Sequence, residues 1–310
     1  MKQVLFALTL VLAALSLGEF HLFQFNLWLT MVLALFGLHV ITGLAGMISM
    51  GHGALMGMGA YSAALSAMHL ASAWAWGPWT TLAFALTVAV LTGAVAGALL
   101  ALIAGRLSGH LLALTTFALA AAWPQWLKSP WVSAITSGSQ GLVWSALPSG
   151  EWAARGLTLA LLVVLASCMG LERWARTRHW GLALQAMRDH PQATRELGFD
   201  LKALKVWAFA ISGAITSLAG ALGAAWVGFV SPDAHSALLS ITLLVGLAVS
   251  GVGQVASLWL GAAFIQFVPN WAADWSQSMP WAIQGACLLL VAYLAPRGWA
   301  QAWRHWRHRA

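Results

Sequence analysis

Long stretches of the chain carry no charged residue. The first runs from Phe20 to Gly105, and three more cover residues 207–232, 234–273 and 275–296. A helix needs about 20 mainly apolar residues to cross the hydrocarbon core of a bilayer, so these stretches allow several crossings. The alternation of apolar and polar residues that is typical of a membrane β-barrel is absent. Because backbone groups in lipid must find partners within the chain, the pattern predicts transmembrane α-helices.

Composition agrees with this interpretation. The 310 residues are 61% hydrophobic and only 7% charged, whereas soluble domains carry roughly 25% charged residues. A surface with so few ionic groups would not stay dispersed in water. We therefore expect an all-α fold, a polytopic transmembrane helical bundle that forms one membrane-spanning domain over residues 1–310.

Basic residues gather in two segments, residues 173–205 and the tail 297–310. Segments rich in Lys and Arg stay on the cytoplasmic side of a membrane, so we expect both in the cytoplasm. An even number of crossings must then separate them. This predicts a re-entrant break near Gly251–Gln254, where two short helices dip into the membrane and return. The same count along the whole chain predicts about ten membrane helices, within a range of about eight to eleven.

Other turns follow from the same count. We expect a return near Gly43–Gly53, an external segment at residues 128–154, and an external turn at Ser231–Asp233.

Glycines are dense between Gly37 and Tyr61. Small residues let membrane helices approach closely, and helix packing alone explains most of these glycines. Ser49, His52 and Gly53 also suit a broken helix that lines a transport path. A buried, hydrogen-bonded histidine is the simpler explanation of His52, and both interpretations stay open.

Motifs of catalysis are absent. The sequence has no G-x-x-x-x-G-K-[ST] phosphate loop, no H-E-x-x-H and no G-x-S-x-G, so we expect no catalytic residue, no metal site and no cofactor. All eight acidic residues lie in loops or at the ends of expected spans. Proton- and sodium-driven carriers commonly place ionisable side chains within the membrane, a role that only His39 and His52 would fill. An ion-driven carrier or a passive channel is therefore the weaker alternative.

Residues 189–198, within the basic loop, predict one short helix. Asp189 or His190 can cap its N-terminus, Pro191 fits the first turn, and Gly198 suits a left-handed end. The helix is too short and too charged to cross lipid. It is either an ordinary solvated helix or a lateral helix that docks into a cytoplasmic partner.

Five motifs, in order along residues 35–268, resemble one family. Residues 37–61 resemble the G-x-x-x-G-x-x-G-x-x-S-x-G-H-x-x-x-x-G-x-G-A-Y segment of branched-chain amino-acid ABC importer permeases of the LivM type. The other four resemble that family's T-G-G-s-x-G-L loop, its G-r-a-l-x-A-i-r-d-x-P-x-A-A-x-x-l-G cytoplasmic segment, its G-x-i-s-P turn and its S-i-x-x-L-x-x-x-v-x-G-G-x-G run; they cover residues 136–142, 180–198, 228–232 and 240–253. Ser137, Thr194 and Ser250 depart from the motifs.

The resemblance implies the permease subunit of an ABC importer that moves a small neutral, branched-chain amino acid into the cytoplasm. Permeases for urea and short amides are similar to the same family and remain an alternative. The implied partners are a second, similar permease subunit, two ATP-binding subunits that hydrolyse the ATP, and a soluble periplasmic substrate-binding protein. The implied location is a bacterial inner membrane.

The resemblance also suggests which residues act. The residues expected to couple transport to the ATPase subunits are Asp189, Pro191, Ala193, Arg195, Glu196 and Gly198. The candidates for the substrate path are Ser49, His52, Gly53, Gln140 and Ser231.

Overall fold

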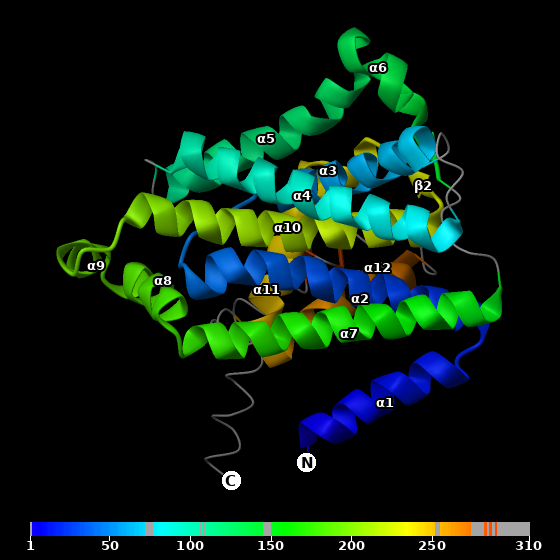
Figure 1. Cartoon of the computed structure of the whole chain (residues 1–310), viewed down its shortest axis with the longest axis horizontal. Coiled ribbons are helices and arrows are strands. Elements are labelled where there is room, and N and C mark those ends of the chain that lie inside the picture. Colours follow the sequence, from blue (N-terminus) through cyan, green and yellow to red (C-terminus); the bar gives the residue numbers. More distant parts are fainter. Residues whose placement is uncertain are drawn as a thin grey trace.

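The computed structural model describes residues 2–71, 77–105, 107, 109–144, 150–251 and 255–273, together with residues 282, 283, 285, 286 and 289. The described chain is almost wholly helical (Figure 1). This confirms the predicted all-α class. The two described strands are only two residues long each and form one antiparallel pair, in which Leu142 lies opposite Val230.

Helix α10 (Leu201–Val227) is the centre of the bundle. It packs against α2 (Glu19–His39), α3 (His52–Leu65) and α4 (Pro78–Ala104). Figure 1 shows α10 between α4 and α2, with α5 and α6 beyond α4, and α7 and α1 beyond α2. The remaining elements are α1 (Lys2–Ser16), η1 (Val40–Leu44), η2 (Ser66–Ala71), α5 (His110–Lys128), α6 (Pro130–Thr136), η3 (Gly138–Gln140), β1 (Leu142–Val143), α7 (Glu151–Arg176), α8 (His179–Asp189), α9 (Pro191–Glu196), β2 (Phe229–Val230), η4 (Asp233–His235), α11 (Ala237–Ser250), η5 (Val255–Ser257) and α12 (Leu258–Ala273).

Small residues let α10 lie directly against its neighbours. Gly213 of α10 faces Gly93 and Gly97 of α4, and a Cβ atom on Gly213 would overlap the Gly93 carbonyl oxygen. On another side, the backbone of Ser217 touches Gly59 of α3. Helices in lipid associate through this kind of close backbone packing. Helix packing is therefore the role that the structure gives to these glycines.

The bundle has two distinct ends. At one end, Lys205 Nζ donates to the carbonyl oxygen of Gly105 at 2.9 Å, so the end of α4 meets the start of α10. At the other end, Lys128 Nζ lies 2.7 Å from Asp233 Oδ1, so the end of α5 meets the turn after α10. The basic segment before Lys205 thus lies opposite the loop after Lys128, as the charge pattern predicts. Which end faces the cytoplasm stays a prediction.

Helices α11 and α12 form a hairpin. A Cβ atom on Gly246 of α11 would overlap Ile265 of α12, and the Ser250 side chain lies against Gly261. Residues later in α11 therefore meet residues earlier in α12, and the two helices are antiparallel.

The hairpin turns back inside the bundle. Gly251 follows α11 with a φ of 84°, a conformation that favours glycine. Just after this turn, the carbonyl oxygen of Trp259 accepts a hydrogen bond from Trp28 Nε1, near the middle of α2. The chain thus turns back near Gly251, where the parity argument places a break, and the re-entrant course of α11 and α12 through the membrane stays a prediction. Residues 252–254 of the expected break lie outside the described residues.

Five described segments are long and apolar enough to cross a membrane: residues 19–44, 78–104, 152–176, 201–227 and 255–272. Shorter apolar helices cover residues 6–16 and 237–250. The polytopic helical bundle is therefore confirmed. The total of about ten membrane helices stays a prediction, because most of the last expected crossing, residues 281–296, and the whole tail 297–310 lie outside the described residues.

Replacing Gly213 with Leu should separate α10 from α4, since the new side chain would overlap the α4 backbone. We expect a loss of about 3 kcal/mol in stability, measured by thermal unfolding of the purified protein. Gly156→Leu is the matched control, because only one ring carbon of Trp79 lies within 4 Å of the position that its Cβ would take. Equal losses in the two variants would contradict the close contact.

A cysteine at Gln140 should react with a membrane-impermeant thiol reagent added to intact cells, whereas cysteines at Arg195 and Arg307 should not. The reason is that basic segments stay inside, and exposed Gln140 lies at the end opposite Arg195. The native Cys168 and Cys287 are first replaced by Ala. External labelling at Arg195 would reverse the assigned orientation.

Candidate functional site

The junction between α2 and α3 is an interrupted helix inside the bundle. Helix α2 continues as a π-helical turn, η1, and residues 45–51 are then non-helical before α3 begins at His52. Such π-turns often mark functional sites. Ser49 and His52 are buried at this junction, with 1% and 0% of their surfaces exposed. We call residues 45–53 the break.

Side chains from distant helices satisfy the backbone of the break. Met50 N–H donates to Thr116 Oγ1 of α5 at 2.9 Å, and Gly53 N–H donates to Ser240 Oγ of α11 at 2.8 Å. The first amide groups of a helix have no partner within the helix. Gly53 carries one of these amide groups, and Ser240 supplies its partner; Met50 precedes the helix, and Thr116 supplies the partner of its amide. Two other helices therefore hold the break in place.

The imidazole of His52 belongs to a short chain of hydrogen bonds. Its Nε2 lies 2.8 Å from Ser212 Oγ, which donates its own proton to the carbonyl oxygen of Gly37 at 2.6 Å. Because that proton is used, Ser212 must accept from His52 Nε2–H, which leaves Nδ1 without a proton. Nδ1 has no hydrogen-bond partner among the described residues. One ring nitrogen of His52 is therefore hydrogen-bonded, and the other is a buried acceptor without a hydrogen-bond partner among the described residues.

A buried charged cluster lies where α7 meets the end of α2. Only 5% of the Glu172 surface is exposed, and its Oε1 lies 3.6 Å from His39 Nε2. Arg176 pairs with the same carboxylate and lies 3.4 Å from the His39 ring. Glu172 is at a helix end, as predicted, but its burial was not foreseen. The available signal was the Glu172–Arg176 spacing of four residues, which favours an ion pair on one helix face.

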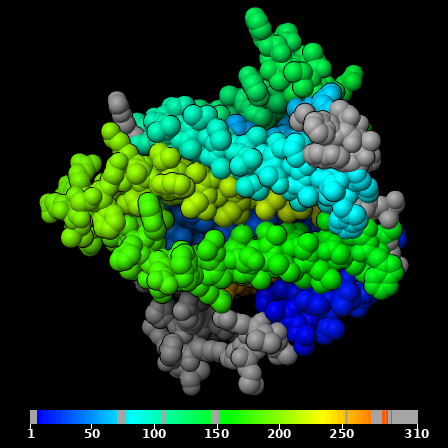
Figure 2. All heavy atoms as spheres, in the orientation of Figure 1, coloured from blue at the N-terminus to red at the C-terminus, as the bar shows by residue number. Residues whose placement is uncertain are grey.

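The basic segment forms two helices that project from one end of the bundle. Figure 2 shows α8 and α9 as a lobe at one end of the molecule. Of the two predicted caps, Asp189 is the last residue of α8 and His190 takes the N-cap position. Gly198 takes the left-handed conformation, with a φ of 89°.

Most of α9 is exposed. Pro191, Ala193, Arg195 and Glu196 all face the surroundings, whereas Thr194 is buried and donates its hydroxyl proton to the His190 carbonyl oxygen at 3.0 Å. The helix thus offers an open face with a small residue, Ala193, flanked by charges.

Gln140 and Ser231 lie apart from the break, beside the paired strands. Gln140 is exposed and precedes β1, and Ser231 follows β2. Tyr61, whose hydroxyl lies 3.5 Å from the Val230 carbonyl oxygen, is nine residues along α3 from His52, or roughly 13 Å. The five path candidates therefore form two groups at different depths.

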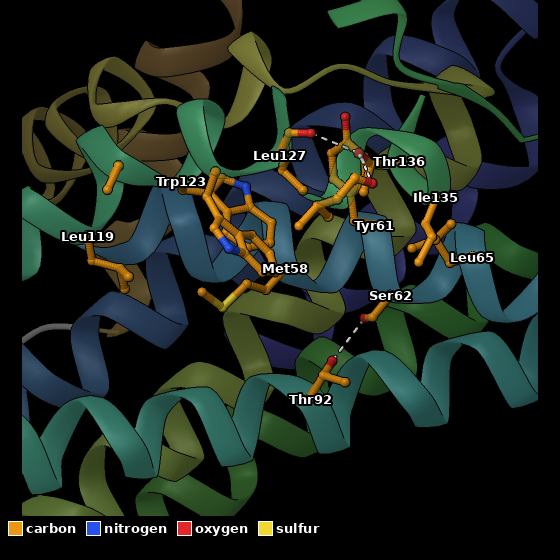
Figure 3. Close-up of a pocket in the computed structure, with 13 residues that line it drawn as sticks. Met58, Tyr61, Ser62, Leu65, Thr92, Leu119, Trp123, Leu127, Ile135 and Thr136 are labelled. Carbon is orange, nitrogen blue, oxygen red and sulfur yellow. Dashed lines mark hydrogen bonds between the residues drawn. The ribbon is translucent and has the colours of Figure 1, made fainter. Parts of the chain in front are cut away.

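A cavity of about 720 Å³ opens between α3, α4, α5 and α6 (Figure 3). Tyr61, Trp123 and Leu127 line it on one side, and the hydrogen-bonded pair Ser62 and Thr92 on another, with 2.9 Å between the two hydroxyl oxygens. The lining is almost entirely apolar. None of the five path candidates is among the lining residues, so the cavity and the break are separate features.

Among the described residues, no group of three or more His, Cys, Asp or Glu side chains could hold a metal ion. The polar groups of the break are neutral donors and acceptors.

Comparison with known proteins identifies the family. Residues 19–292 match the model of a family described as the permease component of branched-chain amino acid transport systems. The chain belongs to this family. It is 28% identical, over 290 residues, to the high-affinity branched-chain amino acid transport system permease protein LivM of Escherichia coli K12, and equally to that of Salmonella typhimurium LT2. These alignments cover 84% of this permease but only 65% of each relative. No solved structure matches the chain.

Replacing Ser240 with Ala should lower the stability of the permease by about 2 kcal/mol, because the buried Gly53 N–H would lose its partner. Thermal unfolding of the purified protein measures this loss. Ser16→Ala is the control, since its hydroxyl is exposed and bonds only to Leu12 of its own helix. If Ser240→Ala unfolds at the control's temperature, Ser240 does not hold the break.

Proposed function

We propose that this permease is the membrane subunit of an ATP-driven importer for a small neutral amino acid of the branched-chain type. Family membership supports the transport role, and the relatives carry the words "branched-chain amino acid transport" in their names. The observation that carries the ATP-driven mechanism is the lobe of α8 and α9, which is exposed, basic and joined to the bundle at one end.

The proposed assembly has four further chains. They are a second, similar permease subunit, two ATP-binding subunits and a soluble periplasmic substrate-binding protein. The complex lies in the bilayer of a bacterial inner membrane. ATP is bound and hydrolysed by the partners, and this chain needs no cofactor. The lobe and the C-terminal tail face the cytoplasm in this proposal.

The α9 helix acts as the coupling helix. Its open face presents Ala193 to a groove on an ATPase subunit, and Arg195 and Glu196 contact the rim of that groove. Asp189 and Gly198 delimit the helix, and both adjoin exposed chain. Interface cores carry most of the binding free energy, whereas charges at the rim contribute less.

The substrate path includes the break and the strand pair at the outer end. A zwitterion is recognised by dipoles and helix ends as well as by full charges, and the break offers neutral groups of this kind at Ser49, His52 and Gly53. Gln140 and Ser231 would lie at the outer entrance. Urea or a short amide would suit the same neutral groups and is the alternative substrate.

A proton-coupled carrier is the second candidate function. The observation that favours it is the buried cluster of Glu172 and His39, since ionisable groups within the membrane commonly relay protons. The cluster lies near the ends of α2 and α7, however, and not in the middle of either helix. The ATP-driven importer therefore remains the proposal.

Reconstitution into vesicles separates the candidates. With the partner permease, the ATPase subunits, the binding protein and ATP, we expect uptake of leucine, isoleucine or valine, and no uptake when the ATPase subunits are omitted. Uptake driven by a proton gradient alone would favour the carrier. Uptake of urea in place of the amino acids would retain the ATP-driven class and change the substrate.

Ala193→Trp should abolish ATP-driven uptake, because the large ring would prevent close docking of α9. Arg195→Ala is the matched comparison and should retain most of the activity, since it removes only a rim charge. Both residues are exposed, so both variants should accumulate in the membrane normally. Uptake by Ala193→Trp equal to that of the wild type, at equal abundance, would leave α9 as an ordinary solvated helix.

A further inference from the structure

Arg188 connects the lobe to the end of α2. It lies in the last turn of α8, and its Nη1 donates to the carbonyl oxygen of Gly43 at 2.8 Å. Gly43 belongs to the π-helical turn that precedes the break. The two residues are far apart in the sequence, and this hydrogen bond adds a polar contact where α8 and the end of α2 already meet in one buried apolar cluster that includes Met187, Ile41 and Ala45.

The hydrogen bond from Arg188 gives the Gly43 carbonyl group a partner that its own helix does not supply. The last carbonyl groups of a helix lack partners within it. The carbonyl oxygens of Val40 and Ile41 accept from the amides of Ala45 and Met47, whereas that of Gly43 accepts from Arg188. A cation at this position is also favoured by the negative end of the helix dipole.

The backbone of the break leaves room for the methylene groups of Arg188 at Gly46. Gly46 has a φ of 70°, and a Cβ atom there would overlap the Cγ of Arg188. The methylene groups of Arg188 therefore lie directly on Gly46. Any other residue at position 46 would strain the backbone and push the arginine away.

The same guanidinium group also pairs with Asp189, the last residue of α8. Arg188 Nε lies 2.8 Å from Asp189 Oδ1, and this bond holds the pKa of the Asp189 carboxyl group below its ordinary value. Asp189 is separated from the first residue of α9 only by His190. One side chain thus contacts both the segment proposed to meet the ATPase and the segment that leads into the break.

The other links near this contact, the apolar cluster around Met187 and the cluster of Glu172 and His39, are more enclosed. Glu172 and His39 are buried, with side-chain exposures of 3% and 0%, whereas 36% of the Arg188 side chain is exposed. The buried Glu172–His39 cluster is typical of a contact that stays formed. The partly exposed Arg188 side chain is typical of a contact that can break and form again.

We propose that Arg188 is the positioning residue that transmits movement of α8 and α9 to the break between α2 and α3. The inference rests on the proposed function, because it assigns the route by which docking of the ATPase subunits alters the membrane segment. Arg188 acts through the carbonyl group of Gly43 and the backbone of Gly46, and it need not touch the substrate.

Arg188→Ala tests the route in the reconstituted transporter. We expect the variant to retain its ATPase subunits on purification and to hydrolyse ATP, while the amount of amino acid taken up per ATP falls about tenfold. Arg188→Lys should recover part of this ratio, since an ammonium group can donate to Gly43 but cannot match the planar fork of arginine. Arg178→Ala, which removes a cation stacked on Trp174 in the same segment, should leave the ratio within about twofold of the wild type.

A second pair of variants approaches the contact from the other side. Gly46→Ala should lower the uptake per ATP as Arg188→Ala does, because the added methyl group displaces the arginine stem. Gly109→Ala is its control, since Gly109 also has a positive φ, of 58°, but no atom lies within 4 Å of the position of its Cβ. Backbone strain alone would affect both variants alike.

The outcomes are distinct. Wild-type uptake per ATP in Arg188→Ala would overturn the inference, and so would loss of the ATPase subunits, which would make Arg188 part of the docking surface itself. If Arg188→Ala does not accumulate in the membrane, Arg188→Lys and Gly46→Ala decide, and a normal ratio in both overturns the inference. Absence of ATP-driven uptake by the wild type would instead refute the proposed function, and this inference with it.

Discussion

Every backbone N–H and C=O group in the lipid interior must find a partner within the protein, and this requirement governs the whole structure. Long helices meet it by themselves. The break at residues 45–53 does not. It persists because the hydroxyl oxygens of Thr116 and Ser240 accept from its amide groups, and because Arg188 donates to the Gly43 carbonyl oxygen just before it. Non-helical backbone at this depth therefore depends on the arrangement of the helices around it.

The glycines make that arrangement possible. Gly93 and Gly97 let α4 reach the backbone of α10, and Gly37 lets α2 reach the backbone of Ser212, whose hydroxyl lies 2.8 Å from His52. Close packing and hydrogen bonding are thus two consequences of one feature, the small residues of α10. A bundle held by larger side chains would keep its neighbours too far apart for short hydroxyl groups to reach the break.

Much of the fold could be predicted from the sequence, because lipid imposes simple rules. The parity of basic segments placed a break near Gly251, where the hairpin turns, and the dense glycines of residues 37–61 indicated close helix packing. The partners of the break could not be predicted, since nothing in the spacing of Ser240 or Thr116 shows which amide each will meet. Likewise, the burial of Glu172 depends on how α7 lies against α2, which is a property of tertiary packing. The roles of the coupling and path residues stay predictions.

The central claim is that the break responds to events at the lobe of α8 and α9. Hydrogen–deuterium exchange in the assembled transporter measures this most directly, through a peptide that contains the amides of Met50, Gly51 and Gly53. The account predicts that exchange in this peptide changes when a non-hydrolysable ATP analogue binds the ATPase subunits, and that Arg188→Ala removes the change. Identical exchange with and without the analogue, in a transporter whose α9 is protected by docking, would contradict it.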